Sequence, residues 1–207
     1  AGRDGDALFA LDRAIRLKSD FAQAHNNRGI ARLRVGRRAD AIASFERALA
    51  LQPGYADAAL NLAERCNEAG DAARAIELFG IVLAAQPAHV QAQTGRDFAQ
   101  ALAGDLPASI EALERITASA PGYAPAWQTL GAARNWAWQH DAAESAFRRA
   151  LALDPRLDEA AFGVASTLLA RGNYTDGWAA FEQRPDRGAE SGAAFAALRV
   201  WDGRAFD

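Results

Sequence analysis

The sequence predicts an all-α fold, a right-handed α-solenoid of stacked antiparallel helix hairpins. Two observations support this prediction. Four of the 7 prolines, Pro53, Pro87, Pro121 and Pro155, follow one another at intervals of 34 residues, and a period of that length is typical of stacked repeat units. Alanine supplies 53 of the 207 residues and β-branched residues are sparse, a composition that favours closely packed helices over sheets.

Each repeat is expected to contain two helices joined by a turn. Seventeen residues before each of the four prolines stands Gly36, Gly70, Gly104 or Trp138, and Gly172 continues the series. Glycine ends a helix readily, and proline cannot continue one because it lacks the backbone N–H. The predicted helices span about 22–35 and 38–51, 56–69 and 72–85, 90–103 and 106–119, 124–137 and 140–153, and 158–171 and 174–183. Trp138, which replaces the glycine, is expected to fill a gap between hairpins.

The second helices carry two columns of equivalent residues, one with small side chains and one with large apolar side chains. The small column is Ala41, Ala75, Ser109, Ala143 and Gly177, and the large column is Phe45, Phe79, Leu113, Phe147 and Phe181. The two columns are four residues apart, so they lie on the same face of each helix. Small residues beside large ones allow the two helices of a hairpin to interlock.

The fourth unit carries the most complete set of signature residues: Trp127, Leu130 and Gly131 on the first helix, and Ala143, Phe147, Ala150 and Pro155 on or just after its partner. This set resembles the tetratricopeptide repeat. The resemblance covers nearly the whole chain and implies a superhelix whose first helices line a concave face that binds peptides or protein segments. Five units are predicted within residues 20–184, at about 22–55, 56–89, 90–123, 124–157 and 158–184. Residues 1–19 would be the second helix of a truncated repeat, and residues 185–207 a linker, a short capping helix and a C-terminal tail.

Ten residues of the first helices are predicted to line the peptide-binding groove: Asn27, Leu60, Asn61, Glu64, Asn67, Glu68, Phe98, Gln128, Asn135 and Trp136. Asn27 and Asn61 are equivalent in adjacent units, and their amides could bond an extended backbone or be ordinary surface groups. Trp136 is the predicted anchor, with core packing as the alternative. The glutamates would favour a basic peptide if they act in binding, and otherwise form a solvated face.

The third unit departs from the pattern. Its first helix has Asp97 in an inward column that holds Gly29, Ala63, Gly131 and Ala165 in the other units. A polar group there needs a partner or water. The unit is interpreted either as a degenerate repeat, in which Arg96 pairs with a carboxylate, or as a hinge or binding notch.

Composition argues against several other classes of protein. The net charge of −3 gives no basic surface for nucleic acid, and no apolar run reaches the roughly 20 residues that would insert in a membrane. Cys66 is the only cysteine, and His25, His89 and His140 fall in three different units, so neither a metal site nor a catalytic triad is predicted. We therefore expect a cytoplasmic, non-catalytic protein-interaction scaffold that needs no cofactor and binds a protein or peptide.

The two ends of the chain suggest further possibilities. Gly177-Trp178, the segment 181–184 and Trp201-Asp202-Gly203 look like the junction at which the repeat array of some bacterial proteins leads into a glycosyltransferase-like domain. The alternative function is therefore a substrate-recruiting arm of a bacterial O-linked N-acetylglucosamine transferase-like enzyme, whose catalytic domain would be absent from this chain. At the other end, a lone half-repeat would expose some of Leu8, Leu11 and Ile15, either as a truncation scar or as a homodimer surface.

Overall fold

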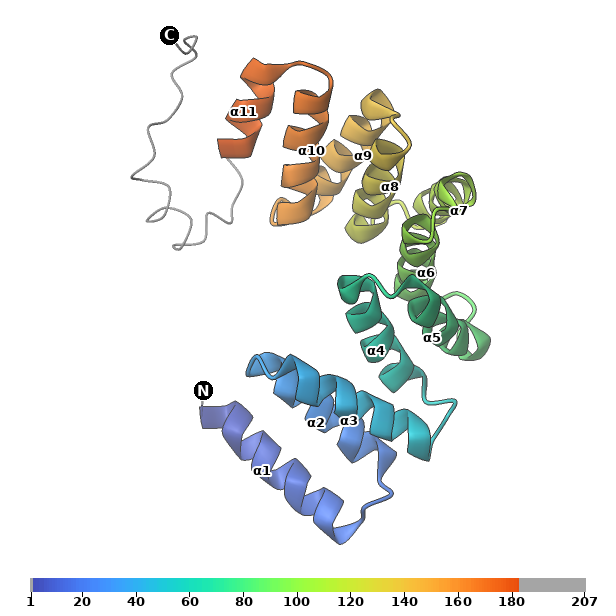
Figure 1. The fold of residues 1–207 in the computed structure, drawn as a ribbon, viewed down its shortest axis with the longest axis vertical. Helices are drawn as coiled ribbons and strands as arrows, with labels where there is room; N and C mark the ends of the chain where they lie inside the picture. Colours follow the sequence, from blue (N-terminus) through green and yellow to red (C-terminus); the bar gives the residue numbers. More distant parts are fainter. Residues whose placement is uncertain (1, 183–207) are drawn as a thin grey trace.

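The computed structural model describes residues 2–182, which form a curved array of α-helices with no strand in that range (Figure 1). The helices are α1 (Gly2–Leu17), α2 (Ala22–Arg34), α3 (Arg38–Leu51), α4 (Ala56–Ala69), α5 (Ala72–Ala85), α6 (Val90–Leu102), α7 (Leu106–Ser119), α8 (Ala124–Trp136), α9 (His140–Leu153), α10 (Asp158–Ala170) and α11 (Tyr174–Glu182). From α2 onward, each begins at the predicted residue and ends within one residue of the predicted end. The predicted linker, capping helix and tail lie outside the described residues.

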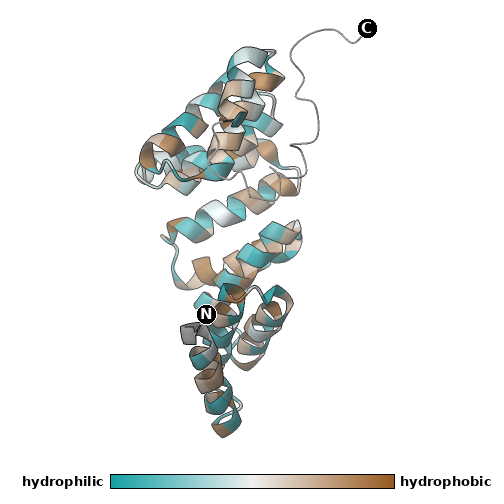
Figure 2. Cartoon of the chain, turned by 90° about the vertical axis from the view of Figure 1, so that its left-hand side faces the viewer, coloured by the Kyte–Doolittle hydropathy of each residue, from teal (hydrophilic) through white to brown (hydrophobic). Residues whose placement is uncertain are grey.

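The helices are amphipathic and pack as an all-α solenoid. Each first helix packs against the second helix of its own unit and against the second helix of the preceding one. The first helices α2, α4, α6, α8 and α10 also contact one another in succession, along the inner side of the curve (Figure 1). Hydrophobic and hydrophilic residues are interspersed along the helices (Figure 2). None of the helices within residues 2–182 is long and apolar enough to cross a membrane.

The N-terminal helix α1 packs against α2. Its residues Leu8, Leu11 and Ile15 are half-buried, whereas Phe9 is 68% exposed. The most exposed large apolar side chains described on α1 are therefore Phe9 and Leu17, which is 82% exposed, while the three predicted residues are exposed only in part.

The turn between the two helices of a unit requires a left-handed residue. Gly36, Gly70, Gly104 and Gly172 have φ angles between 75° and 98°, and Trp138 has a φ of 60° in the same column. The expectation that Trp138 fills a gap is wrong, because its side chain is 80% exposed and its ring meets the edge of His140, with centroids 5.6 Å apart. The left-handed turn points this side chain outward rather than between the hairpins.

Replacing Trp138 by glycine is expected to stabilise the chain by about 0.5–1 kcal/mol. A residue with a Cβ in the left-handed conformation destabilises the folded state by roughly 1–2 kcal/mol, which glycine would relieve. Glycine also gives the unfolded chain more conformational freedom, which offsets about 0.4–1 kcal/mol of that gain. Urea unfolding measures the difference. Trp138→Ala is the matched control, because it removes the ring but keeps the Cβ, and should bring no gain. Equal gains from both variants would show that the ring, rather than the turn, is unfavourable.

Phenylalanines of the large column pack directly on glycines of the first helices. A Cβ placed on Gly29 would lie 2.4 Å from the ring of Phe45, and one on Gly131 would lie 2.7 Å from the ring of Phe147. Phe147 also packs on Gly163 of the next unit, where a Cβ would lie 2.5 Å from its ring. Because real Cβ contacts are not this short, these rings fill space that only glycine leaves open.

In the third unit, Asp97 is buried between α6 and α7. Its side chain is 1% exposed, and a terminal nitrogen of Arg96 donates to its carboxylate over 3.5 Å. Arg96 therefore pairs with a carboxylate, as the degenerate-repeat interpretation expects. The backbone carbonyl of Asp97 accepts a hydrogen bond of 2.7 Å from the Ser109 hydroxyl. Burial raises the pKa of Asp97, against the opposing effect of the Arg96 and Arg115 charges.

Asp97→Asn is expected to stabilise the chain at pH 7 by about 1 kcal/mol, because it removes a buried charge and keeps the shape of the side chain. The raised pKa means that the folded state binds the Asp97 proton more tightly than the unfolded state. Ionised Asp97 therefore opposes folding at neutral pH, and this penalty disappears as the pH falls through the folded pKa towards the unfolded value.

Urea unfolding of both forms at pH 7 and pH 4 tests this sign. The advantage of the asparagine variant should shrink at pH 4, and Glu77→Gln, at an exposed position on α5, should change little at either pH. A variant less stable than the wild type at pH 7 would show that the carboxylate is a net stabilising group.

Candidate functional site

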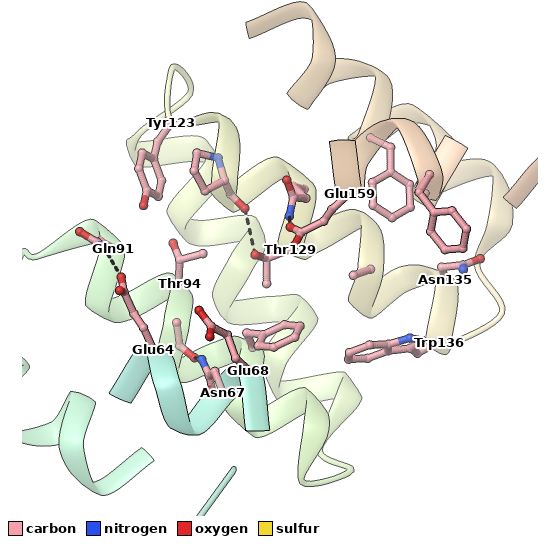
Figure 3. A pocket seen from close by; sticks show the side chains of 18 of the residues that line it. Glu64, Asn67, Glu68, Gln91, Thr94, Tyr123, Thr129, Asn135, Trp136 and Glu159 are labelled. Atoms are coloured by element: carbon pink, nitrogen blue, oxygen red, sulfur yellow. Dashed lines mark hydrogen bonds between the residues drawn. The ribbon is translucent and has the colours of Figure 1, made fainter. Parts of the chain in front are cut away.

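A cleft of about 770 Å³ lies along the inner side of the array, bordered by α4, α6, α8 and α10 (Figure 3). Polar and aromatic side chains together form its walls. They are the carboxylates of Glu64, Glu68 and Glu159, the guanidinium of Arg65, the amides of Asn67, Gln91, Gln128 and Asn135, the hydroxyls of Thr94, Thr129 and Ser166, and the rings of Phe98, Tyr123, Trp136 and Phe162. We call this cleft the groove.

Seven of the ten sequence-predicted residues line the groove: Glu64, Asn67, Glu68, Phe98, Gln128, Asn135 and Trp136. The structure brings them together because the 34-residue period places them on neighbouring first helices that face the same side. The other three, Asn27, Leu60 and Asn61, lie outside this cleft.

These three residues lie nearer the N-terminus. Asn27 is exposed on α2. Leu60 is half-buried and packs against the apolar core. The Asn61 side-chain nitrogen donates to the Asn26 side-chain oxygen over 3.0 Å, a bond that joins α4 to α2. Of the two equivalent asparagines, Asn61 therefore serves in a contact between α2 and α4, and Asn27 is exposed.

The floor of the groove includes two phenylalanine rings that sequence reasoning missed. Gly95 and Gly163 occupy the same column as Asn27 and Asn61, and both line the groove together with Phe79 and Phe147. A Cβ on Gly95 would lie 2.3 Å from the Phe79 ring. The absent side chains thus let the rings reach the floor. The sequence signal that could have predicted this floor is glycine at two positions of the Asn27 and Asn61 column.

An aromatic pair forms part of the wall. The rings of Phe98 on α6 and Trp136 on α8 have centroids 5.8 Å apart and are tilted by 39°. Trp136 is 42% exposed, so a large part of its side chain faces solvent at the groove. Such a geometry gives a bound side chain an apolar surface at little entropic cost.

The acidic side chains are tied into hydrogen bonds across the groove. Glu64 on α4 accepts from the Gln91 amide of α6, and Glu159 on α10 accepts from the Gln128 amide of α8 (Figure 3). Arg65 pairs with Glu68 and lies 3.6 Å from Glu64. The Gln91–Glu64 and Gln128–Glu159 bonds join neighbouring first helices, whereas the Arg65 pairs lie within α4.

Other polar contacts fix the remaining amides. The Asn67 side-chain nitrogen donates to the backbone carbonyl of Gly95 over 2.8 Å. The Asn135 oxygen lies 3.0 Å from the His140 ring nitrogen and accepts from Thr167 over 3.4 Å. Burial raises the pKa of Tyr123, and the negative charge of Glu64 raises it further, so the tyrosine keeps its proton at neutral pH.

The described residues hold no cluster of metal ligands. In residues 2–182 no group of three or more His, Cys, Asp or Glu side chains is placed to hold a metal ion. Cys66 is buried, and burial raises the pKa of its thiol. What the groove can do chemically is bind: it offers hydrogen-bond acceptors, a negative charge and an aromatic surface.

The fold and the groove define an α-solenoid built from helix hairpins. A family model described as tetratricopeptide repeat matches residues 27–87, 67–124 and 139–191. These ranges cover well over half of the sequence. The chain belongs to the tetratricopeptide repeat family, as its 34-residue period predicts.

Solved structures of other tetratricopeptide proteins share the fold. TTC0263, a thermophilic TPR protein of Thermus thermophilus, has a TM-score of 0.72 at 22% sequence identity, over 84% of this chain and 97% of that chain. A tetratricopeptide repeat protein from Parabacteroides merdae ATCC 43184 has a TM-score of 0.73 at 19% identity, over 87% of this chain and 72% of that chain. MamA from Desulfovibrio magneticus RS-1 has a TM-score of 0.59 at 20% identity, over 78% of this chain and 91% of that chain.

The comparison with curated protein sequences found no match. Likeness to structures at these identities shows the fold alone, so the function is argued from the groove.

Proposed function

We propose that the chain is a non-catalytic scaffold that binds an extended segment of another protein in the groove. Its fold suggests a protein–protein interaction scaffold. The observation that supports this site most strongly is the half-exposed Trp136, paired with Phe98 in a cleft of about 770 Å³. Ligand clefts typically enclose about 300–1,000 Å³ and combine an apolar wall with a few fixed polar groups.

The dimensions of the array suit an extended segment. Neighbouring packed helices lie about 8–10 Å apart, so the three steps from α4 to α10 cover roughly 27 Å. An extended chain advances about 3.3 Å per residue. A segment of about eight residues therefore crosses the groove and meets all four first helices.

Affinity capture with mass spectrometry tests this function. The wild-type chain and a Phe98→Ala/Trp136→Ala double variant are used as baits in a lysate of the source organism. We expect partners that the wild type retains and the double variant loses, whereas Phe9→Ala, at an exposed position on α1 that is not part of the groove lining, retains them. Identical partner sets for all three baits would refute the groove as the binding site.

The glycosyltransferase-arm alternative uses the same groove for a different purpose. It is supported by Gly177-Trp178 and the segment 181–184, together with Trp201-Asp202-Gly203, of which residues 183–207 lie outside the described range. Any transferase activity would reside in a further domain. Sequencing the reading frame beyond Asp207 decides between the two: a glycosyltransferase sequence supports the recruiting arm, and a stop codon removes it.

A homodimer through the N-terminal half-repeat stays a prediction. The exposed Phe9 and Leu17 on α1 are the apolar groups in its favour. Light scattering of the wild type and of Phe9→Asp should then show a dimer that the substitution dissociates. A wild-type chain that stays monomeric at high concentration would exclude this surface.

A further inference from the structure

We infer that the groove selects a polypeptide segment in which an arginine stands close to an aromatic or other large apolar residue. This inference rests on the proposed function and specifies the chemistry of its partner. It follows from an imbalance between hydrogen-bond acceptors and donors on the groove walls, together with the position of the aromatic pair.

Acidic groups predominate among the charged residues of the groove. Its lining holds three carboxylates, Glu64, Glu68 and Glu159, against the single guanidinium of Arg65. Arg65 pairs with Glu68 and Glu64, and Arg38, which is outside the lining, pairs with Glu68 as well, so the carboxylate without a cationic partner among these contacts is Glu159. Glu159 accepts a hydrogen bond from the neutral amide of Gln128, so its charge is not balanced by that contact. A cationic ligand therefore matches the charge of the groove.

Neutral oxygens add to this excess of acceptors. Asn67 and Gln128 each use the side-chain nitrogen as a donor within the chain, to Gly95 and Glu159 respectively. Their side-chain oxygens have no hydrogen-bond partner among residues 2–182. The donor bonds thus set the orientation of both amides, and the side-chain oxygens remain as hydrogen-bond acceptors.

Thr94 gives an independent indication of a missing donor or acceptor. Its side chain lines the groove and is only 5% exposed, and its hydroxyl oxygen has no hydrogen-bond partner in the described part of the chain. Buried polar atoms are nearly always paired. Figure 3 shows Glu64, Thr94 and Glu159 on three different helices around the same space. A bound group with several N–H donors could supply partners to Thr94 and to Glu64 and Asn67 on the neighbouring α4 after small side-chain rotations, and Glu159 would be met by a separate part of the ligand.

Arginine fits this arrangement better than lysine. The guanidinium has five N–H donors in a planar fork and can engage acceptors on separate walls at once, whereas an ammonium presents three donors from one point. The planar group can also stack on an aromatic ring. The neighbouring acceptors Glu64 and Asn67 on α4 and Thr94 on α6 therefore favour the planar group with several donors.

The aromatic wall of the groove is the reason to expect a large apolar residue near the arginine. Phe98 and Trp136 lie on α6 and α8, beside the acceptor-rich part of the groove, and the Phe79 and Phe147 rings reach its floor. Consecutive residues of an extended segment point to opposite sides, so residues two apart share one face. An arginine and an aromatic residue separated by one or two positions would reach both regions together.

The test is selection from a phage-displayed library of random octapeptides against the whole chain. Selected peptides are then synthesised with arginine or with citrulline, its neutral isostere, and titrated against the wild type, Glu64→Gln/Glu159→Gln and Trp136→Ala. The matched control is Glu77→Gln/Glu111→Gln, which removes two exposed carboxylates from the second helices α5 and α7. We expect enrichment of an arginine separated from an aromatic residue by one or two positions, and we expect citrulline or the groove double variant to weaken binding at least tenfold.

Each other outcome contradicts a definite part of the inference. Peptides that need Trp136 but are neutral or acidic, or that bind as well with citrulline, would overturn the arginine preference and leave the proposed function intact. Peptides that bind Trp136→Ala as tightly as the wild type, or no enrichment at all, would overturn the groove itself. If the chain instead dimerises and Trp136→Ala dissociates the dimer, a second copy is the occupant and the inference is wrong.

Discussion

Phe147→Ala is expected to lower the free energy of unfolding by about 3–5 kcal/mol, the cost typical of deleting a buried aromatic ring. The Phe147 side chain is 4% exposed. Its ring packs on Gly131 in its own unit and on Gly163 in the next, and neither glycine position can hold even a Cβ while the ring is in place. The substitution therefore opens a cavity that spans two units, and glycine cannot fill it.

Urea unfolding measures the loss, and hydrogen exchange locates it. In a repeat array each unit contacts only its neighbours, so protection should fall most in α8 to α11 and least in α2 to α4. Phe9→Ala is the matched control, because the same side chain is removed from an exposed position and the change should stay within about 0.5 kcal/mol. Equal losses at the two sites would show that Phe147 does not join the units.

Trp136→Ala is expected to weaken the binding of a partner segment at least about 30-fold, which corresponds to roughly 2 kcal/mol, the usual threshold of an interface hot spot. The ring presents a half-exposed surface beside Phe98, and alanine would remove most of that apolar contact area. Since the side chain contributes little to the interior, the fold should persist with an unchanged circular dichroism spectrum.

Trp138→Ala is the control for this measurement. It removes a tryptophan only two positions away, which is 80% exposed but is not part of the groove lining. Isothermal titration of both variants should show a loss for Trp136 alone. Similar losses would indicate that the partner binds around the turn after α8, and an unchanged affinity for both would remove this wall from the binding surface.

Most of the fold could be predicted from the sequence because its signals are local and repeated. Proline after the second helix and glycine after the first recur in nearly every unit, so each boundary is determined several times over. Trp138 shows where this reasoning ends. Its place in the glycine column predicts a turn, but only the backbone geometry, with a φ of 60°, shows that the side chain points to solvent.

The groove could be predicted in part. Periodicity identifies which residues face the inner side, and seven of the ten predicted residues line one cleft. It does not tell where the inner face is open. Asn61 bonds to Asn26, which depends on how closely α2 and α4 approach, and the floor at Gly95 depends on the position of the Phe79 ring. Both contacts depend on how neighbouring units pack, which cannot be predicted from a column of equivalent residues.

The most direct measurement is a crystal structure of the chain bound to a segment obtained by capture or selection. We predict an extended segment of about eight residues lying across α4, α6, α8 and α10, with an apolar side chain against Trp136. A segment bound instead on the outer second helices, or one that leaves Phe98 and Trp136 exposed to solvent, would contradict the assignment of this groove as the binding site.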